Sequence, residues 1–596
     1  MADQHGSDIR FPDPAEISRT MAGIAERSQR ILSAFLSRQS SESQPGHQDP
    51  LNIGSAFLEL TAKMMADPAK LVRAQMSLWQ DYMNLWQHTA RRMMGEEIEP
   101  VASADEDRRF RDTAWEDNML FDFIKQSYLL TSRWMQSTVR DVEGLDEKTA
   151  RKVDFYTRQF ADAMSPSNFV LTNPEVLRMT IETGGENLVK GLDNLLEDLE
   201  RGKGRLKIKM TDTEAFSVGD NIATTPGKVI YQNELMQLLQ YRPATETVYE
   251  RPLLIIPPWI NKYYILDLRE SNSFIKWAVE RGHTVFVVSW VNPDATLAEK
   301  TFEDYMTGGP LAALDIIATA TGVEKVNAVG YCLGGTLLAC MLSYMAAKGD
   351  ERIVSATYLA TMIDFAEAGE LSVFVDEEQL DYLEHRMNRK GYLEGQYMAT
   401  TFNMLRANDL IWSFVINNYL LGKDPFPFDL LYWNSDSTRM PAAMHSFYLR
   451  KFYQENVLVR PGGITLKGVP IDLSRVKVPA YFLSTREDHI APWRSTYSAT
   501  QLFSGPVRFV LSASGHIAGV INPPAANKYF HWTNARTPKN PERWFLGAEQ
   551  HSGSWWDDWR KWVARRGGKK VPARTPGGGK LTPIEDAPGS YVKARA

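Results

Sequence analysis

Residues 325–335 read Lys325-Val-Asn-Ala-Val-Gly-Tyr-Cys332-Leu-Gly-Gly335 and are followed by Thr336-Leu-Leu-Ala-Cys-Met-Leu-Ser-Tyr-Met-Ala-Ala347. Residues 326–329 are typical of a buried strand, residues 330–335 predict a tight turn, and residues 336–347 have helical spacing. This order around Gly-x-Cys-x-Gly predicts a nucleophile elbow, a strained strand-to-helix turn that exposes one side chain above a sheet. The exposed side chain would be that of Cys332.

Two interpretations of Cys332 are open at this point. A thiolate there would be favoured by the free amides and dipole of the following helix. The alternative is a buried free cysteine, which is what most lone cysteines are. The flanking glycines favour the nucleophile. Cys332 and Cys340 are the only cysteines of the chain and lie eight positions apart. We therefore expect no disulfide, and a reducing compartment.

Beyond residue 206 the chain consists of short β-branched runs separated by helical patterns. The runs are residues 228–232, 253–256, 284–289, 326–329, 353–359, 480–484 and 508–511. This alternation predicts a mainly parallel sheet with helices on both faces. Residues 364–441 interrupt it with a helical, aromatic-rich segment, which we interpret as a cap or lid at the carboxyl edge of the sheet. A larger core is the alternative.

The remaining organisation is read from composition. Residues 1–50 are polar and predict a mostly disordered N-terminus. Residues 51–205 predict a helical domain that ends at a basic, glycine-containing seam, and residues 206–596 predict the α/β catalytic domain. Met and Trp are dense in residues 53–94. So many Met and Trp side chains indicate either packing between helices or an adaptable apolar surface that binds a partner or a hydrophobic product.

A cysteine nucleophile needs a base and a group that orients the base. Asp488 follows the predicted strand 480–484, and His516 follows the strand 508–511. The chain order nucleophile, acid, histidine is that of α/β-hydrolases, so Cys332, Asp488 and His516 are the predicted triad. His489 is a possible accessory residue, but neighbours in an extended segment point opposite ways, and Glu487 is disfavoured for the same reason.

The oxygen that becomes negative on attack at a carbonyl needs backbone donors. We expect one from Leu333, the residue after the nucleophile, and one from Ile260 or Asn261 in the proline-containing loop after residues 253–256. No histidine pair has metal-ligand spacing with a third partner, so no metal is predicted.

The bulk composition describes an ordinary globular protein. The chain has 596 residues, 43% hydrophobic and 23% charged, with a net charge of -6, which argues against general nucleic-acid binding. Neither a signal peptide nor an apolar run of the roughly 20 residues needed to cross a bilayer is visible. The sequence predicts a soluble or peripheral protein.

Several motifs together resemble the class I polyhydroxyalkanoate synthases, which polymerise 3-hydroxyacyl-CoA thioesters into polyester. The motifs are Arg108-Arg-Phe-Arg-Asp-Thr-Ala-Trp115, Gly219-Asp-Asn-Ile-Ala-Thr-Thr-Pro-Gly227, Pro257-Pro-Trp-Ile-Asn-Lys-Tyr-Tyr-Ile-Leu-Asp267, Ser289-Trp-Val-Asn-Pro293, Gly330-Tyr-Cys-Leu-Gly-Gly335, Trp433-Asn-Ser-Asp436, Arg486-Glu-Asp-His489 and Gly515-His-Ile-Ala-Gly519. The resemblance implies that Cys332 is the acylated nucleophile, His516 the base and Asp488 the third member.

The same resemblance implies a substrate class and a setting. It implies (R)-3-hydroxyacyl-CoA, typically 3-hydroxybutyryl-CoA, as substrate, no cofactor, a homodimer, and residence on cytoplasmic polyester granules. N-terminal helices would help with granule attachment and dimer stability, and phasin-type granule proteins are open partners. The Trp-rich residues 555–562 suit a surface role or packing on the catalytic domain. The rival functions are a cysteine hydrolase such as a thioesterase, and a non-catalytic granule-surface protein.

Overall fold

The computed structural model describes residues 53–104 and 107–595, and the predicted disordered N-terminus at residues 1–50 lies outside them. The chain forms two compact units. The helical unit contains the described residues up to Asp212 together with Phe402–Phe426. The sheet unit contains Thr213–Thr401 and Pro427–Ala596.

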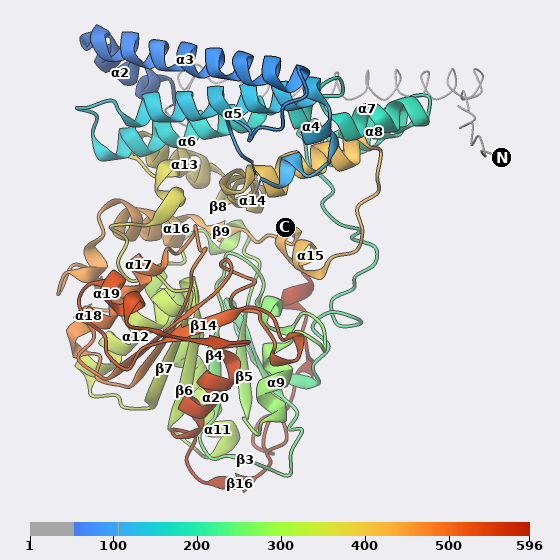
Figure 1. Ribbon diagram of the computed structural model, residues 1–596. Coiled ribbons are helices and arrows are strands. Elements are labelled where there is room, and N and C mark those ends of the chain that lie inside the picture. Colours follow the sequence, from blue (N-terminus) through green and yellow to red (C-terminus); the bar gives the residue numbers. More distant parts are fainter. Residues whose placement is uncertain (1–52, 105–106, 596) are drawn as a thin grey trace. The chain divides into compact units, whose positions relative to one another are not determined.

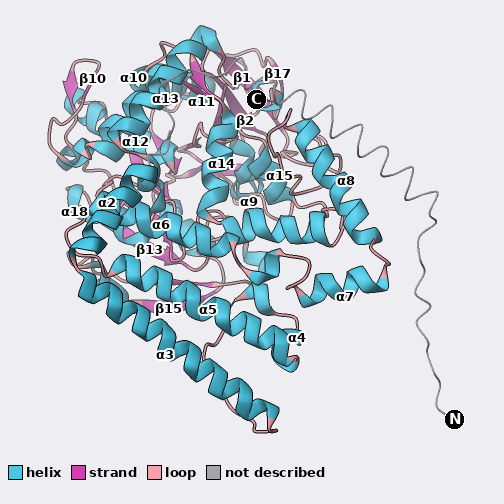
Figure 2. Cartoon of the chain, turned by 90° about the horizontal axis from the view of Figure 1, so that it is seen from above, coloured by secondary structure: helices cyan, strands magenta, loops and turns pink. Residues whose placement is uncertain are grey.

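The helical unit is built from seven α-helices over the described residues. They are α2 (Ile53–Ala66), α3 (Pro68–Met93), α4 (Ala114–Asp117), α5 (Met119–Arg140), α6 (Glu147–Ala163), α7 (Pro174–Glu182) and α8 (Glu186–Arg201). Figures 1 and 2 show α3, α5 and α6 running alongside one another. Side-chain caps fix where three of the helices start. The N-cap residues are Asn118 for α5, Asp146 for α6 and Asn173 for α7.

Helix α3 is apolar on two sides. Its inner side packs Leu85 against α5. Its outer side has exposed apolar residues at steps of three and four: Val72, Met76, Trp79, Met83 and Trp86, which are 40–67% exposed. This spacing places them in one stripe along the helix, which we call the outer face of α3.

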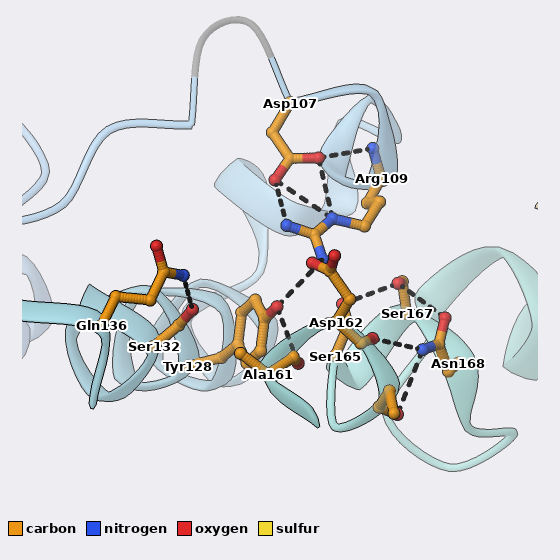
Figure 3. A network of polar contacts seen from close by, with 11 residues as sticks. Asp107, Arg109, Tyr128, Ser132, Gln136, Ala161, Asp162, Ser165, Ser167 and Asn168 are labelled. Atoms are coloured by element: carbon orange, nitrogen blue, oxygen red, sulfur yellow. Dashed lines mark hydrogen bonds and ion pairs between the residues drawn. The ribbon is translucent and has the colours of Figure 1, made fainter. Parts of the chain in front are cut away.

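A polar network around Arg109, which lies in the motif at residues 108–115, connects α5 and α6 (Figure 3). The guanidinium donates to the hydroxyl of Tyr128 at 2.9 Å and to Oδ1 of Asp162 at 3.0 Å, and it pairs with Asp107 at 2.7 Å. Tyr128 lies on α5 and Asp162 on α6, so one side chain joins both helices.

The sheet unit contains an eleven-stranded sheet in the order β15-β14-β13-β12-β7-β6-β4-β5-β2-β1-β17. The strands are β1 (Gly227–Gln232), β2 (Met236–Tyr241), β4 (Leu253–Ile256), β5 (Val285–Trp290), β6 (Val326–Tyr331), β7 (Ile353–Leu359), β12 (Ala480–Thr485), β13 (Val507–Ser512), β14 (Phe530–Thr533), β15 (Glu549–Ser552) and β17 (Glu585–Asp586). The six strands from β13 to β5 are parallel, and those outside them pair antiparallel. The predicted fold class is confirmed.

Helices cover both faces of this sheet. On one face α11 (Ala312–Thr321) and α12 (Leu333–Lys348) pack on Leu254 and Phe286. On the other face α9 (Phe274–Glu280) and α20 (Trp556–Ala564) pack on Ile255 and Val287. Figure 1 shows these helices beside β4, β5 and β6. Trp555, Trp556, Trp559 and Trp562 are at most 9% exposed, so the Trp-rich segment is part of the core.

Shorter elements complete the sheet unit. They are β3 (Thr247–Tyr249), α10 (Phe302–Met306), α16 (Ala442–Tyr448), β10 (Thr465–Leu466), β11 (Val469–Pro470), α17 (Trp493–Tyr497), α18 (Ala499–Leu502), α19 (Pro541–Leu546) and β16 (Lys570–Pro572). The pairs β10 with β11 and β3 with β16 form two separate two-stranded sheets.

The segment at residues 364–441 is divided between the two units. It forms α13 (Glu377–Lys390), β8 (Tyr392–Leu393), α14 (Gly395–Leu405), two π-helical turns (Asn408–Trp412 and Val415–Leu420), α15 (Asp429–Ser435) and β9 (Met440–Pro441). Phe402–Phe426 belongs to the helical unit. There the hydroxyl of Tyr419 donates to Asp198 at 2.6 Å, and Asn187 donates to the carbonyl of Leu420 at 2.7 Å.

Candidate active site

The elbow begins where β6 ends. Cys332 has φ 49° and ψ -119°, in the left-handed half of the backbone map, and α12 starts at the next residue. Its amide donates to the carbonyl of Leu359 at 2.9 Å, which fixes the turn against β7. A non-glycine residue with positive φ is strained, and such strain persists only where the surroundings enforce it. Cys332 is half-buried, and Cys340, further along α12, is fully buried.

The small residues of the elbow are required by close backbone approach. A Cβ added to Gly334 would lie 2.0 Å from the carbonyl oxygen of Ile256, at the end of β4. A Cβ added to Gly335 would lie 2.1 Å from Oγ1 of Thr361. Only glycine fits at these contacts. The elbow therefore lies directly against the end of β4 and the loop that follows it.

Asp488 lies in the loop after β12, and its side chain has no exposed surface. One carboxylate oxygen accepts hydrogen bonds from the amides of Ile490 and Ala491, at 2.9 and 2.8 Å. The other accepts from the hydroxyl of Thr485 at 3.0 Å. A buried carboxylate with this many donors is held in one orientation.

His516 lies in the loop after β13, and its Nδ1 atom is 2.7 Å from Oδ2 of Asp488. The imidazole stacks on the ring of Tyr331, with centroids 5.8 Å apart, and the Tyr331 hydroxyl donates to the carbonyl of His516 at 3.3 Å. Burial alone would lower the pKa of His516, but the charges of Asp488 and Cys332, and hydrogen bonds to both, raise that pKa to about 10. Nδ1 faces Asp488, which leaves Nε2 for Cys332.

The structure thus brings Cys332, His516 and Asp488 together at the carboxyl ends of β6, β13 and β12. His489 is half-buried beside Asp488, and its carbonyl lies against Gly369. The chemistry available to such a group is nucleophilic attack by a thiolate, with an imidazole that can give and take a proton.

The candidate oxyanion donors lie on two sides of the elbow. Leu333 is the first residue of α12. Asn261 forms an isolated antiparallel bridge with Ser437. Two residues of an antiparallel bridge form either a hydrogen-bonded or a non-hydrogen-bonded pair, and the first arrangement uses the N–H of Asn261. Neither arrangement uses the N–H of Ile260. Of the two loop amides, the bridge therefore favours Ile260 as a free donor.

Two tryptophans at the start of α20 hold the loop of His516, a role that sequence reasoning did not assign. The indole of Trp556 donates to the carbonyl of Val520 at 2.9 Å. The indole of Trp555 donates to the carbonyls of Gly519 and Val520, both at 3.1 Å. The only sequence signal was the density of tryptophan near the C-terminus.

Two tyrosines beyond residue 441 also belong to the surroundings of Cys332. Burial raises the pKa of Tyr453 far above its ordinary value, and the nearby charges of Cys332 and Asp488 add to the effect. The pKa of Tyr448 is raised in the same direction by burial, with Cys332 among the further causes. The rings of Tyr448 and Tyr453 are 5.7 Å apart. Their position follows from tertiary contacts, so no local pattern identified them.

The described part of the chain offers neither a cluster of metal ligands nor a helix suited to crossing a membrane. Residues 53–104 and 107–595 contain no group of three or more His, Cys, Asp and Glu side chains that could hold a metal ion. Among the helices of the same residues, none combines the length and the apolar character needed to cross a bilayer.

A family model described as "alpha/beta hydrolase fold" matches residues 252–523. Together with the parallel sheet and the elbow, this match shows that the sheet unit has the α/β-hydrolase fold. A second model, described as the N-terminus of poly-beta-hydroxybutyrate polymerase (PhaC), matches residues 106–278.

Relatives extend the match to nearly the whole chain. The chain is 51% identical over 587 residues to the poly(3-hydroxyalkanoate) polymerase subunit PhaC of Rhizobium meliloti, which covers 98% of this chain and 96% of that one. It is 53% identical over 534 residues to the poly(3-hydroxyalkanoate) polymerase of Methylorubrum extorquens, covering 89% and 88%. The PhaC subunit of Cupriavidus necator is 45% identical over 549 residues, covering 91% and 92%. The chain belongs to the poly(3-hydroxyalkanoate) polymerase family.

Proposed function

We propose that this protein polymerises (R)-3-hydroxyacyl-CoA, with (R)-3-hydroxybutyryl-CoA as the preferred substrate, into polyester and releases CoA. Its family membership supports the polymerase activity. The observation that carries the mechanism is the contact between His516 and the buried Asp488 beside the elbow of Cys332. No cofactor takes part, since the thioester is already activated for acyl transfer.

In the first half of the reaction the Sγ atom of Cys332 attacks the thioester carbonyl. The bond to CoA sulfur breaks, and the leaving thiolate takes a proton from His516. Asp488 keeps Nδ1 of His516 protonated and stabilises the imidazolium. The amides of Leu333 and Ile260, with Asn261 as the alternative to Ile260, stabilise the negative oxygen of the intermediate. One thioester replaces another, so neither side is strongly favoured.

In the second half a 3-hydroxyl group attacks the acyl group on Cys332. Nε2 of His516 takes the hydroxyl proton, an ester bond forms, and the thiolate of Cys332 is released. General-base help of this kind contributes about 10²–10⁴-fold to a rate. The polymer grows by one unit, and His516 is again an imidazolium beside a thiolate.

Water must be excluded, because it would hydrolyse the acyl-enzyme. We assign this role to the part of the aromatic segment that lies in the sheet unit, residues 364–401 and 427–441, and to the tyrosines that follow it. Phe365 is 3% exposed and lies 5.0 Å from the ring of Tyr453 and 5.6 Å from that of Phe452. Since residues 402–426 belong to the helical unit, the test is Phe365→Ala rather than deletion of the segment. The ratio of free acid to polymer should rise in this variant. An unchanged ratio would show that the segment does not exclude water from the acyl-enzyme.

The outer face of α3 supports the proposed granule association. Its exposed Met and Trp side chains suit a hydrophobic polyester surface. The proposed homodimer and phasin-type proteins are the competing occupants of the same face. Replacing Trp79 with Glu should move the protein from granules to the soluble fraction. A change from dimer to monomer in light scattering, with granule binding intact, would assign the face to the dimer instead.

One assay tests the proposed activity. Purified protein receives (R)-3-hydroxybutyryl-CoA, and free CoA, monomeric acid and insoluble polymer are followed together. CoA with polymer is the expected result. CoA with monomeric acid would indicate a cysteine hydrolase, and no CoA would indicate a non-catalytic granule protein.

A further inference from the structure

The loop after β4 is held by a second segment of the sheet unit, residues 433–438, which we call the clasp. Both stretches contain motifs that the proposed mechanism leaves unexplained. Nζ of Lys262 lies 2.7 Å from Oδ1 of Asp436, and the two side chains are 4% and 6% exposed. The other oxygen of Asp436 accepts a hydrogen bond from the hydroxyl of Tyr264 at 2.9 Å.

Three further contacts join the clasp to the same loop. The indole of Trp433 donates to the carbonyl of Lys262 at 2.8 Å. The hydroxyl of Thr438 donates to the carbonyl of Trp259 at 2.7 Å. Ser437 forms the bridge with Asn261. The loop is thus tied at successive residues on both sides of Ile260, and the Ile260 amide itself is not used in these ties.

A buried ion pair contributes little to the net stability of a fold. Taking two charges out of water costs several kcal/mol per ion, and apolar replacements of similar volume are often neutral or stabilising. Burial lowers the pKa of Lys262 against the opposing influence of Asp436, which is the signature of this cost. The pair instead fixes the distance between the backbone of the loop after β4 and the backbone of the clasp.

We propose that Lys262 and Asp436 are positioning residues that hold the amide of Ile260 toward the carbonyl oxygen of a thioester at Cys332. The inference rests on the proposed function, in which that amide is an oxyanion donor. The elbow and this loop are in backbone contact, since a Cβ on Gly334 would lie 2.8 Å from the carbonyl oxygen of Pro257. A small shift of the loop would therefore misplace the donor without disturbing the contact between His516 and Asp488.

The test is the double variant Lys262→Met/Asp436→Leu, which removes both charges and leaves neither unpaired. Removal of one oxyanion donor costs about 10²–10³-fold in rate. A misplaced donor should lower kcat for CoA release about 10- to 100-fold with KM nearly unchanged, because the donor acts in the transition state. The buried hydroxyl of Tyr264 loses its acceptor in this variant, so the melting temperature should change by no more than a few degrees. Wild-type kcat in the folded double variant would overturn the proposal.

Alkylation of Cys332 by iodoacetamide separates this inference from the proposed function. That reaction uses the thiolate but no oxyanion, so its rate in the double variant should remain within about 2-fold of wild type. A parallel loss of alkylation would show that the pair acts on the thiolate and would overturn the proposal. If wild-type protein alkylates at Cys332 but releases no CoA, the proposed function fails instead.

Two further variants keep the outcome decisive. Thr438→Val removes a separate tie to the loop and should lower kcat in the same direction, and this variant decides if the double variant does not fold. Wild-type kcat in Thr438→Val would then overturn the proposal.

Arg352→Met/Asp350→Leu removes a partly buried pair at the amino ends of the strands and is the matched control. It should change kcat less than about 2-fold.

Discussion

The Nδ1 atom of His516 lies 2.7 Å from an oxygen of Asp488 whose side chain is wholly buried. The carboxylate is already satisfied by two amides and a hydroxyl, so it does not need the histidine for its own solvation. The contact instead fixes the tautomer and orientation of the imidazole.

Asp488→Asn should therefore preserve the fold and lower kcat for CoA release by about 10²–10⁴-fold, because the amide no longer stabilises an imidazolium. The matched control is Glu487→Gln, an exposed neighbour in the same loop. Its rate should equal that of wild type. Equal losses in the two variants would mean that loop charge, and not the contact with His516, controls the reaction.

The tryptophans of α20 should act on kcat through the loop of His516. Trp556→Phe keeps an aromatic ring and removes the hydrogen bond to Val520. One such bond is worth about 1 kcal/mol, so kcat should fall about 5-fold while KM stays constant. Trp562→Phe, on the same helix but packed on Tyr481, serves as control. Equal kinetics in both variants would contradict the assigned role.

Arg109 should contribute to the free energy of unfolding of the helical unit. Arg109→Met leaves the partly buried Asp107 and Asp162 without their cation, so the free energy of unfolding should fall by about 2–3 kcal/mol. The control is Arg151→Met, since Arg151 pairs with Glu147 on an exposed helix surface and such pairs contribute about 0.5 kcal/mol or less. Hydrogen exchange of α5 and α6 measures both. Equal protection in the two variants would exclude the network as a major source of stability.

His283 should make the sheet unit sensitive to acid. It is buried with both ring nitrogens unpaired among the described residues, and burial, reinforced by Lys570, lowers its pKa to about 3. Between about pH 3 and 6.5 the unfolded chain binds the proton and the folded chain does not, so stability falls as the pH falls through this window. At pH 5 wild type should lose about 2 kcal/mol relative to His283→Phe, compared with pH 7.5. Urea titrations at both pH values measure this. Parallel pH dependence in the two proteins would contradict it.

Local pattern predicted the strands that carry the elbow and the two loops, because each is a short apolar run rich in β-branched residues. Strand β2 was missed: Met236-Gln-Leu-Leu-Gln-Tyr241 has no β-branched residue and owes its conformation to pairing with β1 and β5. Asp488 and His516 could be proposed from sequence because parallel strands end at the same edge, which brings together whatever follows them.

Contacts between distant residues account for what the sequence could not reveal. Tyr419 reaches Asp198, 221 positions away, and this draws residues 402–426 into the helical unit. Lys262 and Asp436 are 174 positions apart, and neither has a local partner that would mark it as half of a buried pair. Such pairings depend on the whole fold and leave no periodic trace in the sequence.

In the proposed mechanism the growing ester is held as a thioester on Cys332. The direct measurement is mass spectrometry of protein quenched during turnover of (R)-3-hydroxybutyryl-CoA, followed by peptide mapping. The peptide containing Cys332 should gain one or more 3-hydroxybutyryl groups, in wild type and in Cys340→Ala alike, and Cys332→Ala should carry none. Acylation of another residue, or polymer formation by Cys332→Ala, would rule out Cys332 as the residue that carries the growing chain.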